Sequence, residues 1–290
     1  MIDIECVWPA EALLGEAPYW HAEEEAVYWV DIDGRKVFRY DPCSGRRHVV
    51  EQDHEVGCLV PRKGGGFIAG IDAGLAWINS DLMVADVFAS PEKDNPRTRF
   101  NDGKCDRRGR FWVASADRNE TEAIAALYVV DVSGEITKVM SDVIVGNGMG
   151  WSPDNRTMYF TETGRGTIHA FDYDIETGTI GNQQVFATVP EAKGYPDGLT
   201  VDADGFVWSA HWSGWRVTRY TPDGLIDQEI LLPVPCVTSL TFGGDSLDRL
   251  FITTARIGLN DQQLKEAPLS GGLFAVDVGI QGISETEFAG

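Results

Sequence analysis

The chain of 290 residues carries 45 acidic and 24 basic side chains, and its formal net charge is −21. Such a charge repels phosphate backbones and anionic lipid headgroups, so we expect neither nucleic acid nor a membrane surface as a partner. Hydrophobic residues make up 43% of the chain and charged residues 24%, which is ordinary for a globular protein with a sizeable core. The excess of carboxylates suits metal binding, although most of them are expected to be solvated.

Five cysteines are scattered along the chain without a C-x-x-C pair, at Cys6, Cys43, Cys58, Cys105 and Cys236. An odd number of widely spaced cysteines favours reduced thiols over a disulfide framework or a thiolate zinc site. The first residues lack the basic and long apolar regions of a signal peptide. No apolar run approaches the ~18 residues that span a bilayer. We therefore expect a soluble, cytoplasmic protein.

One type of segment recurs six times along the chain. Each copy begins at glycine or a small polar residue and runs through an apolar stretch and a polar turn into an aromatic-rich strand. In chain order the copies cover residues 15–31, 56–70, 102–114, 147–161, 197–208 and 238–253. Successive copies are offset by about 41 to 50 residues, which is the period of a propeller blade.

A second type of strand, rich in β-branched and aromatic residues, is exemplified at residues 36–41, 167–172, 216–220 and 272–277. Only residues 261–266 suggest a helix, of one or two turns. Four short strands per unit predict an all-β, six-bladed β-propeller whose blades pack radially around a central channel. Residues 2–8 are expected to pair with the strands of residues 272–288 and close the ring, so that residues 1–290 form one domain.

Polar residues occupy several of the positions where the first strand of each blade is expected to meet the mouth of the channel. In chain order these positions are Glu16, Gly57, Asn101 with Asp102, Asn147, Asp197, and Thr238 with Ser239. Asp-Gly and Asn-Gly pairs also form ordinary turns, which is the alternative explanation for most of them, whereas glutamate is no turn former. Together these side chains offer hard oxygen ligands for Ca²⁺, Mg²⁺ or Mn²⁺. The pattern predicts one metal site at the channel, with open positions for water or substrate.

Arg99 lies just ahead of Asn101 and is expected at the same mouth. In a very acidic protein its guanidinium offers fixed donors for substrate oxygens, and a surface salt bridge is the alternative. Other chemistries have less support. The five histidines show no H-x-H or H-E-x-x-H spacing, and there is no G-x-S-x-G nucleophile elbow and no P-loop.

These residues lie within motifs that resemble the SMP-30/gluconolactonase/luciferin-regenerating (regucalcin-like) family, over nearly the whole chain. The motifs are Leu14-Gly-Glu-Ala-Pro18, Arg99-Phe-Asn-Asp-Gly-Lys104, Asn147-Gly-Met-Gly-Trp-Ser152, Tyr195-Pro-Asp-Gly-Leu199 and Thr238-Ser-Leu-Thr-Phe-Gly-Gly244. The resemblance implies that Glu16, Asn147 and Asp197 bind one divalent cation, which is Ca²⁺, Zn²⁺, Mg²⁺, Mn²⁺ or Fe²⁺.

The same resemblance implies that Asp197 doubles as the general base and that Arg99 and Asn101 hold substrate oxygens. It places a further substrate contact at Asn119, with Glu120 beside it as the alternative. This stretch departs from the family's usual Gly-Thr-Met pattern, which leaves the recognised hydroxyl pattern open.

The activity implied by the resemblance is the metal-dependent hydrolysis of a sugar-acid lactone to the free sugar acid, in carbohydrate catabolism. Candidate substrates are aldonolactones such as glucono-, xylono- or arabinonolactone, and no obligate protein partner is expected. Two alternatives stay open, because function depends on the site and not on the fold. One is a phosphotriesterase- or arylesterase-type propeller that uses the same metal on another ester. The other is a non-catalytic calcium-binding regulatory propeller.

Overall fold

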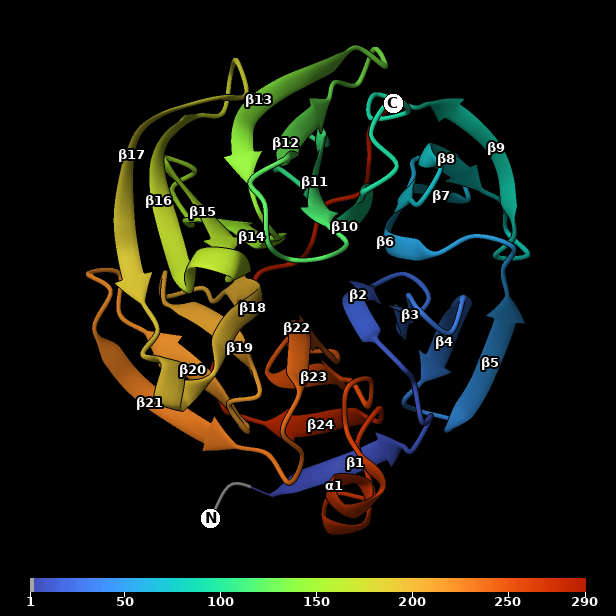
Figure 1. The fold of residues 1–290 in the computed structure, drawn as a ribbon, viewed down its shortest axis with the longest axis vertical. Coiled ribbons are helices and arrows are strands. Elements are labelled where there is room, and N and C mark those ends of the chain that lie inside the picture. The colour runs from blue at the N-terminus through green and yellow to red at the C-terminus, as the bar shows by residue number, and fades with distance from the viewer. Residues whose placement is uncertain (1–2) are drawn as a thin grey trace.

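The structure is a computed structural model that describes residues 3–290. Over these residues 24 β-strands form six four-stranded antiparallel sheets around one axis (Figure 1). This is the six-bladed β-propeller that the repeat predicts. The first strands of the sheets contact one another in a ring, from β2 through β6, β10, β14, β18 and β22 back to β2.

Each of the first three blades is a sheet of four consecutive strands, numbered from the axis outward. Blade 1 contains β2 (Gly15–His21), β3 (Ala26–Asp31), β4 (Lys36–Asp41) and β5 (Arg46–Glu51). Blade 2 contains β6 (Val56–Pro61), β7 (Phe67–Ile71), β8 (Gly74–Ile78) and β9 (Val84–Ala89). Blade 3 contains β10 (Thr98–Cys105), β11 (Phe111–Asp117), β12 (Ala125–Val130) and β13 (Ile136–Val143).

The remaining blades follow the same order, except that the last one takes its outermost strand from the start of the chain. Blade 4 contains β14 (Gly146–Trp151), β15 (Thr157–Glu162), β16 (Thr167–Asp174) and β17 (Thr179–Thr188). Blade 5 contains β18 (Tyr195–Val201), β19 (Val207–Trp212), β20 (Arg216–Tyr220) and β21 (Ile226–Leu231). Blade 6 contains β22 (Val237–Gly243), β23 (Arg249–Thr254), β24 (Leu273–Asp277) and β1 (Ile4–Trp8). Of two 3₁₀ turns, η1 (Thr163–Arg165) connects β15 to β16 within blade 4, and η2 (Glu191–Lys193) lies between blades 4 and 5.

The ring is closed by β1, which pairs antiparallel with β24 as predicted. Residue 2, where the predicted strand begins, lies outside the described residues. The helix expected at residues 261–266 is α1 (Asp261–Glu266), and it is capped by Asn260, whose side chain accepts the N–H groups of Gln262 and Gln263. No helix within residues 3–290 is long and apolar enough to cross a membrane. All five cysteines are free, as expected.

The prediction that strand structure continues to residue 288 is wrong, because blade 6 is complete at Asp277. Residues 278–290 instead cross the propeller and reach the far side of the ring, where the C-terminus is marked in Figure 1. On the way Gly282 N–H donates to Leu247 O at 2.7 Å in blade 6, and Phe288 N–H donates to Pro61 O at 2.8 Å in blade 2. The side chain of Glu285 pairs with Lys104 of β10 at 2.9 Å. The C-terminal segment thus links distant blades. It lies at the end of the axis where, in each blade, the turn connects the innermost strand to the second strand.

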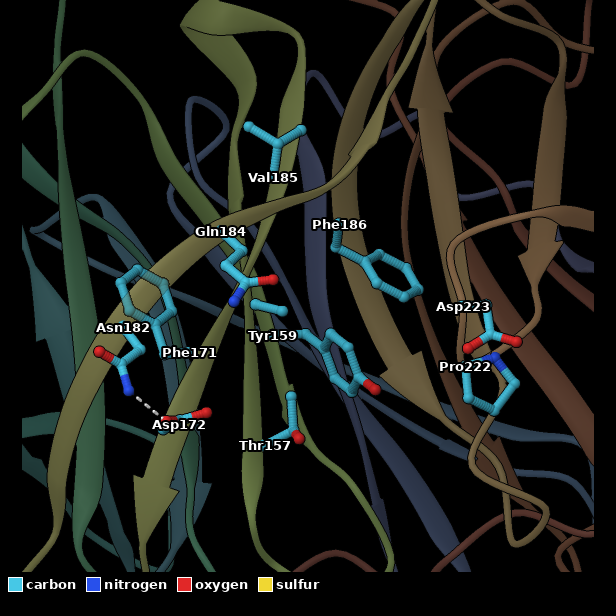
Figure 2. A pocket seen from close by; sticks show the side chains of 11 residues that line it. Thr157, Tyr159, Phe171, Asp172, Asn182, Gln184, Val185, Phe186, Pro222 and Asp223 are labelled. Carbon is cyan, nitrogen blue, oxygen red and sulfur yellow. Dashed lines mark hydrogen bonds between the residues drawn. The ribbon is translucent and has the colours of Figure 1, made fainter.

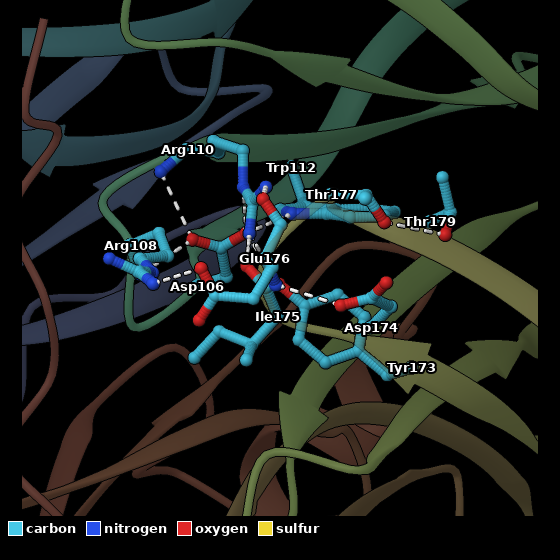
Figure 3. A network of polar contacts seen from close by, with 10 residues as sticks. All are labelled: Asp106, Arg108, Arg110, Trp112, Tyr173, Asp174, Ile175, Glu176, Thr177 and Thr179. Atoms are coloured by element: carbon cyan, nitrogen blue, oxygen red, sulfur yellow. Dashed lines mark hydrogen bonds and ion pairs between the residues drawn. The ribbon is translucent and has the colours of Figure 1, made fainter.

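A buried polar network joins blades 3 and 4 at this same end of the molecule (Figure 3). Its centre is the carboxylate of Asp106, which is fully buried. One oxygen of Asp106 accepts hydrogen bonds from Arg110 Nε at 2.7 Å, from Trp112 Nε1 at 3.0 Å and from the Tyr173 hydroxyl at 2.7 Å. Tyr173 belongs to β16, so the network fixes blade 4 against the first hairpin of blade 3. Asp202 holds Trp208 of blade 5 in the same way, through a bond of 2.8 Å from Nε1.

Candidate metal and substrate site

All six innermost strands contain a β-bulge at an equivalent position. The register shifts fall between Glu16 and Tyr19, Val56 and Cys58, Phe100 and Gly103, Gly146 and Met149, Pro196 and Leu199, and Val237 and Ser239. A bulge twists the strand locally and redirects a side chain, and bulges are common beside active sites. The polar residues therefore lie inside the innermost strands, and not ahead of them as the sequence suggested.

The glycines that follow the polar residues are explained by close packing at the axis, and not by turns. A Cβ atom on Gly148 would lie 2.2 Å from the backbone nitrogen of Leu199 in the next blade. A Cβ atom on Gly198 would lie 2.1 Å from the Ser239 hydroxyl oxygen. Only glycine allows the innermost strands to approach this closely. The turn explanation for Asn147-Gly148 and Asp197-Gly198 is therefore wrong.

The bulges open into a cavity of about 670 Å³ at the end of the axis opposite the C-terminal segment. Five of the residues singled out from the sequence line it, namely Glu16, Arg99, Asn101, Asn147 and Asp197. Their convergence brings together five positions from β2, β10, β14 and β18 that are far apart along the chain. The last predicted substrate contact was Asn119, with Glu120 as the alternative. Among the described residues Glu120 lines the cavity, whereas the exposed Asn119 does not.

Three bulge residues hold their side chains by the same local hydrogen bond, in which a side-chain oxygen accepts the next N–H group. Glu16 Oε2 accepts from Ala17 at 2.8 Å, Asp102 Oδ1 from Gly103 at 2.7 Å and Asn147 Oδ1 from Gly148 at 3.1 Å. Asp197 differs, because its buried Oδ1 atom has no hydrogen-bond partner among residues 3–290. Glu16 and Asn147 lie close enough to Asp197 to shift the pKa of its carboxyl group. The three predicted ligands are therefore immediate neighbours, and an orphaned carboxylate oxygen lies among them.

The electrostatics of this cluster favour a cation. Burial and then the charge of Asp102 raise the pKa of Glu16 to about 8. Burial, followed by the charges of Glu16, Asp102 and Glu120, raises the pKa of Asp197 well above its usual value. Within residues 3–290 none of Glu16, Asp102 and Asp197 forms an ion pair with a basic side chain. Buried carboxylates without partners are costly, and a bound cation removes that cost.

The residues present fit a hard divalent cation. Glu16 and Asp197 supply carboxylate oxygens, and Asn147 supplies an amide oxygen with a second lone pair. Among the residues that the structure describes, no three His, Cys, Asp or Glu side chains form a group that could hold a metal. The predicted set has only two members of those types, so it depends on the asparagine as its third ligand.

Arg99 is not the surface salt bridge that was the alternative for it. Its Nη1 atom donates to Asn101 Oδ1 at 2.7 Å and to Phe100 O at 3.3 Å, and it pairs with no carboxylate in the described part of the chain. Burial lowers the pKa of Arg99, and the negative charges of Asp33 and Glu55 offset this only in part by raising it. Asn101 is fixed in turn, because its Nδ2 atom donates to Gly146 O of blade 4 at 3.0 Å. Both side chains are thus held in the cavity wall by neutral groups.

Asp117, at the end of β11, is a residue that the sequence interpretation missed. Its buried carboxylate accepts the backbone N–H groups of Asn119, Thr121 and Glu122 at 3.0 to 3.3 Å. It also accepts Arg97 Nη2 at 2.9 Å. These bonds fix the loop that carries Arg118 and Glu120 into the cavity. An aspartate that ends a strand and precedes a polar loop was the available signal.

Replacing Asp117 with asparagine is expected to destabilise the protein at pH 7. Burial alone would raise the pKa of Asp117, but hydrogen bonds from Glu122, Thr121, Asn119 and Arg97 lower it to about 2. A carboxyl group whose pKa is lower in the folded than in the unfolded state stabilises the fold when the pH is above its unfolded-state pKa of ~3.9. That contribution to the free energy of unfolding disappears as the pH falls toward ~2. In urea titrations the gap between wild type and Asp117→Asn should therefore narrow from pH 4 to pH 2. A gap that is constant with pH would contradict the role of the charge.

A separate groove of about 310 Å³ lies between blade 4 and the β20–β21 turn of blade 5 (Figure 2). It is lined by aromatic rings such as Tyr159 and Phe186 and by the carboxylates of Asp172 and Asp223. Asp172 is occupied by a hydrogen bond of 2.5 Å from Asn182 Nδ2. No basic side chain is among its described lining residues, and the carboxylates do not converge. This groove does not have the chemistry of the axial cavity.

Comparison with known proteins agrees with this geometry. Residues 14–256 match the model of the SMP-30/gluconolactonase/LRE-like region. The chain belongs to this family. It is 32% identical to regucalcin of Xenopus laevis, over 100% of this chain and 99% of that protein. It is 33% identical to 6-deoxy-6-sulfogluconolactonase of Pseudomonas putida, over 99% of both chains.

A solved structure of a calcium-binding regucalcin from Agrobacterium tumefaciens superposes on this family member with a TM-score of 0.94. The two chains are 27% identical, and the match covers 99% of this chain and 97% of the other. The propeller and its family are thereby established, and they support a sugar lactonase.

Proposed function

We propose that this protein is a metal-dependent lactonase that hydrolyses an aldonolactone to the free sugar acid. The observation that supports it most is the convergence of Glu16, Asn147 and Asp197, with an orphaned Asp197 oxygen, in a cavity that Arg99 and Asn101 also line. The lactonase named among the relatives and the gluconolactonase family model support the same class of reaction.

Glu16, Asn147 and Asp197 would hold the cation, which is expected to be Ca²⁺, Zn²⁺, Mg²⁺, Mn²⁺ or Fe²⁺. A divalent cation supplies Lewis acidity, which makes a lactone carbonyl more electrophilic or a water molecule more acidic. The fixed guanidinium of Arg99 and the amide of Asn101 orient substrate oxygens, since both side chains are held in place before substrate arrives. Glu120 is a further group in reach of a substrate hydroxyl.

In the proposed reaction a water oxygen bonds to the carbonyl carbon while Asp197 accepts a proton from that water. Arg99 donates toward the carbonyl oxygen as it gains negative charge. The bond between the carbonyl carbon and the ring oxygen then breaks, and Asp197 returns its proton to the ring oxygen, which leaves as a hydroxyl group. The product is the open-chain sugar acid, which ionises at neutral pH.

Removal of divalent cations is expected to abolish lactone hydrolysis. The test measures acid release with a pH indicator from glucono-, xylono- and arabinonolactone, before and after chelation and gel filtration. Activity should fall to the uncatalysed rate and should return when one of the five candidate cations is added back.

A chelated protein that keeps its full rate would contradict the role assigned to the cation. Calcium binding without acid release from any lactone would instead support the regulatory alternative. Acid release from aryl or phosphate triesters, but not from lactones, would support the esterase alternative.

A further inference from the structure

A second cavity, of about 420 Å³, adjoins the axial cavity on the side of blades 2 and 3. The two cavities share a wall that contains Arg99 and Arg118. The second cavity, which we call the side cavity, is bordered by the β7–β8 turn and by the loop between β9 and β10. That loop contributes Lys93, and the loop before β6 contributes His54.

The charges around the two cavities differ in sign. The axial cavity is lined by six carboxylates and by only two basic side chains, which are the shared arginines. The side cavity is lined by four basic side chains, His54, Lys93, Arg99 and Arg118, and by two carboxylates, Asp72 and Glu92. In a protein with a net charge of −21, a cavity with an excess of basic groups is the exception.

Both carboxylates of the side cavity already have partners. Asp72 Oδ1 lies 2.8 Å from His54 Nδ1. Glu92 Oε1 accepts the hydroxyl groups of Ser115 and Tyr128, at 2.8 and 3.1 Å, and its buried Oε2 has no partner. The contact with Asp72 occupies His54, so the basic side chains left for an anion in this cavity are Lys93, Arg99 and Arg118.

The basic side chains keep free donors. Lys93 and Arg99 form no ion pair with any carboxylate in residues 3–290. Arg118 pairs with Glu55 through Nη1 alone, at 2.8 Å, and its other guanidinium nitrogens remain available. Arg99 bonds only to neutral oxygens through its Nη1 atom. The free guanidinium nitrogens of Arg118, with Lys93 beyond them, suit a carboxylate, phosphate or sulfonate group.

We infer that the side cavity binds an anionic substituent of the substrate, at the end of the sugar chain remote from the lactone carbonyl. The inference rests on the proposed function, since it takes the carbonyl to lie at Glu16, Asn147 and Asp197. From there the sugar chain passes Arg99, which donates to the carbonyl oxygen, and its last carbon enters the side cavity toward Arg118 and Lys93. The preferred substrate is then an aldonolactone with a terminal carboxylate, phosphate or sulfonate, and not a neutral sugar lactone.

The test compares substrates that differ only in the terminal group. The kcat/KM of the metal-loaded protein is measured for glucono-1,5-lactone and for its 6-phosphate and 6-deoxy-6-sulfonate derivatives. Glucaro-1,4-lactone, which carries the carboxylate, is compared with glucono-1,4-lactone, which has the same ring size. At least one anionic lactone is expected to exceed the neutral one by about tenfold or more, because charge-assisted hydrogen bonds are the stronger ones. The preference should shrink as the ionic strength rises.

The variant Lys93→Gln is expected to lower the ratio of anionic to neutral kcat/KM by about tenfold. Lys93 is exposed on a loop, so this change is compatible with folding. Lys63→Gln is the matched control, because Lys63 is equally exposed in the β6–β7 turn and lines neither cavity. The control should keep the wild-type ratio.

A second measurement separates this inference from the proposed function. Calorimetry compares binding of 6-phosphogluconate and of gluconate, which needs no catalysis. If no lactone is hydrolysed but 6-phosphogluconate binds about tenfold more tightly in a manner that requires Lys93, the side cavity stands and the lactonase fails. If neutral lactone is hydrolysed as fast as every anionic one, and both acids bind equally, the inference is overturned while the lactonase stands.

Discussion

The variant Asp197→Ala is expected to hydrolyse lactones no faster than water alone does. The substitution removes a carboxylate that lines the same cavity as Glu16 and Asn147, and so removes a proposed cation ligand and the proposed proton acceptor at once. General-base catalysis alone contributes roughly 10² to 10⁴ in rate, and loss of the cation adds to this. The measurement is kcat at saturating cation, with cation binding followed by calorimetry on the same preparation.

Two further variants make this result interpretable. Asp197→Asn keeps an amide oxygen for the cation but no base, so kcat should fall as far while cation binding weakens less. Asp223→Ala removes an exposed carboxylate of the β20–β21 turn and should leave both measurements unchanged. Retention of more than about a tenth of the wild-type kcat by Asp197→Ala would refute the assignment of the base, given the rate factor at stake.

The six-bladed fold could be predicted from the sequence because each blade of a propeller packs in the same way, so the same strand pattern recurs six times. Each copy needs an apolar strand at the axis and an aromatic strand beside it, so Trp29, Trp112 and Trp208 recur as fully buried side chains. The path of residues 278–290 was not accessible, because it is not part of the repeat. Its contacts are made to turns in other blades, and no periodic pattern encodes such contacts.

The sequence predicted the candidate residues of the site but not the backbone geometry that orients them. Breaks in the repeat drew attention to Glu16, Asn147 and Asp197 among several polar positions, and the family resemblance singled out these three as metal ligands. The bulges that aim them were missed, because Asn-Gly and Asp-Gly have a ready explanation as turns. The close approach of neighbouring innermost strands shows that the glycines serve strand packing, because a Cβ atom on Gly148 would lie 2.2 Å from the backbone nitrogen of Leu199.

The substrate contact predicted at Asn119 could not be placed correctly for a different reason. Counting along the chain led to Asn119, whereas the loop fixed by Asp117 turns Glu120 toward the cavity. Glu120 has a positive φ of 56°, which an ungapped count cannot anticipate. The surroundings of Arg99 were equally hidden, because the carboxylates whose charges act on it, Asp33 and Glu55, come from blade 1 and from the β5–β6 loop.

The variant Asp106→Ala is expected to lose about 3 to 5 kcal/mol of unfolding free energy, although Asp106 lies far from the cavity. The change leaves Arg110, whose side chain is only 7% exposed, without its carboxylate. It also removes the acceptor of Trp112 Nε1 and of the Tyr173 hydroxyl. Urea titration followed by tryptophan fluorescence measures the loss, and Asp245→Ala, in the exposed turn of blade 6, should change stability by less than about 0.5 kcal/mol.

A second variant separates the cost of leaving Arg110 unpaired from the cost of removing the Asp106 side chain itself. Most of the cost of Asp106→Ala should come from the buried, unpaired guanidinium of Arg110, because a lone buried charge costs more than a missing pair. The double variant Asp106→Ala, Arg110→Met should therefore be more stable than Asp106→Ala alone. A double variant as unstable as the sum of the two single changes would show that the pair acts independently, and that the network in Figure 3 does not lock blade 3 to blade 4 through its charges.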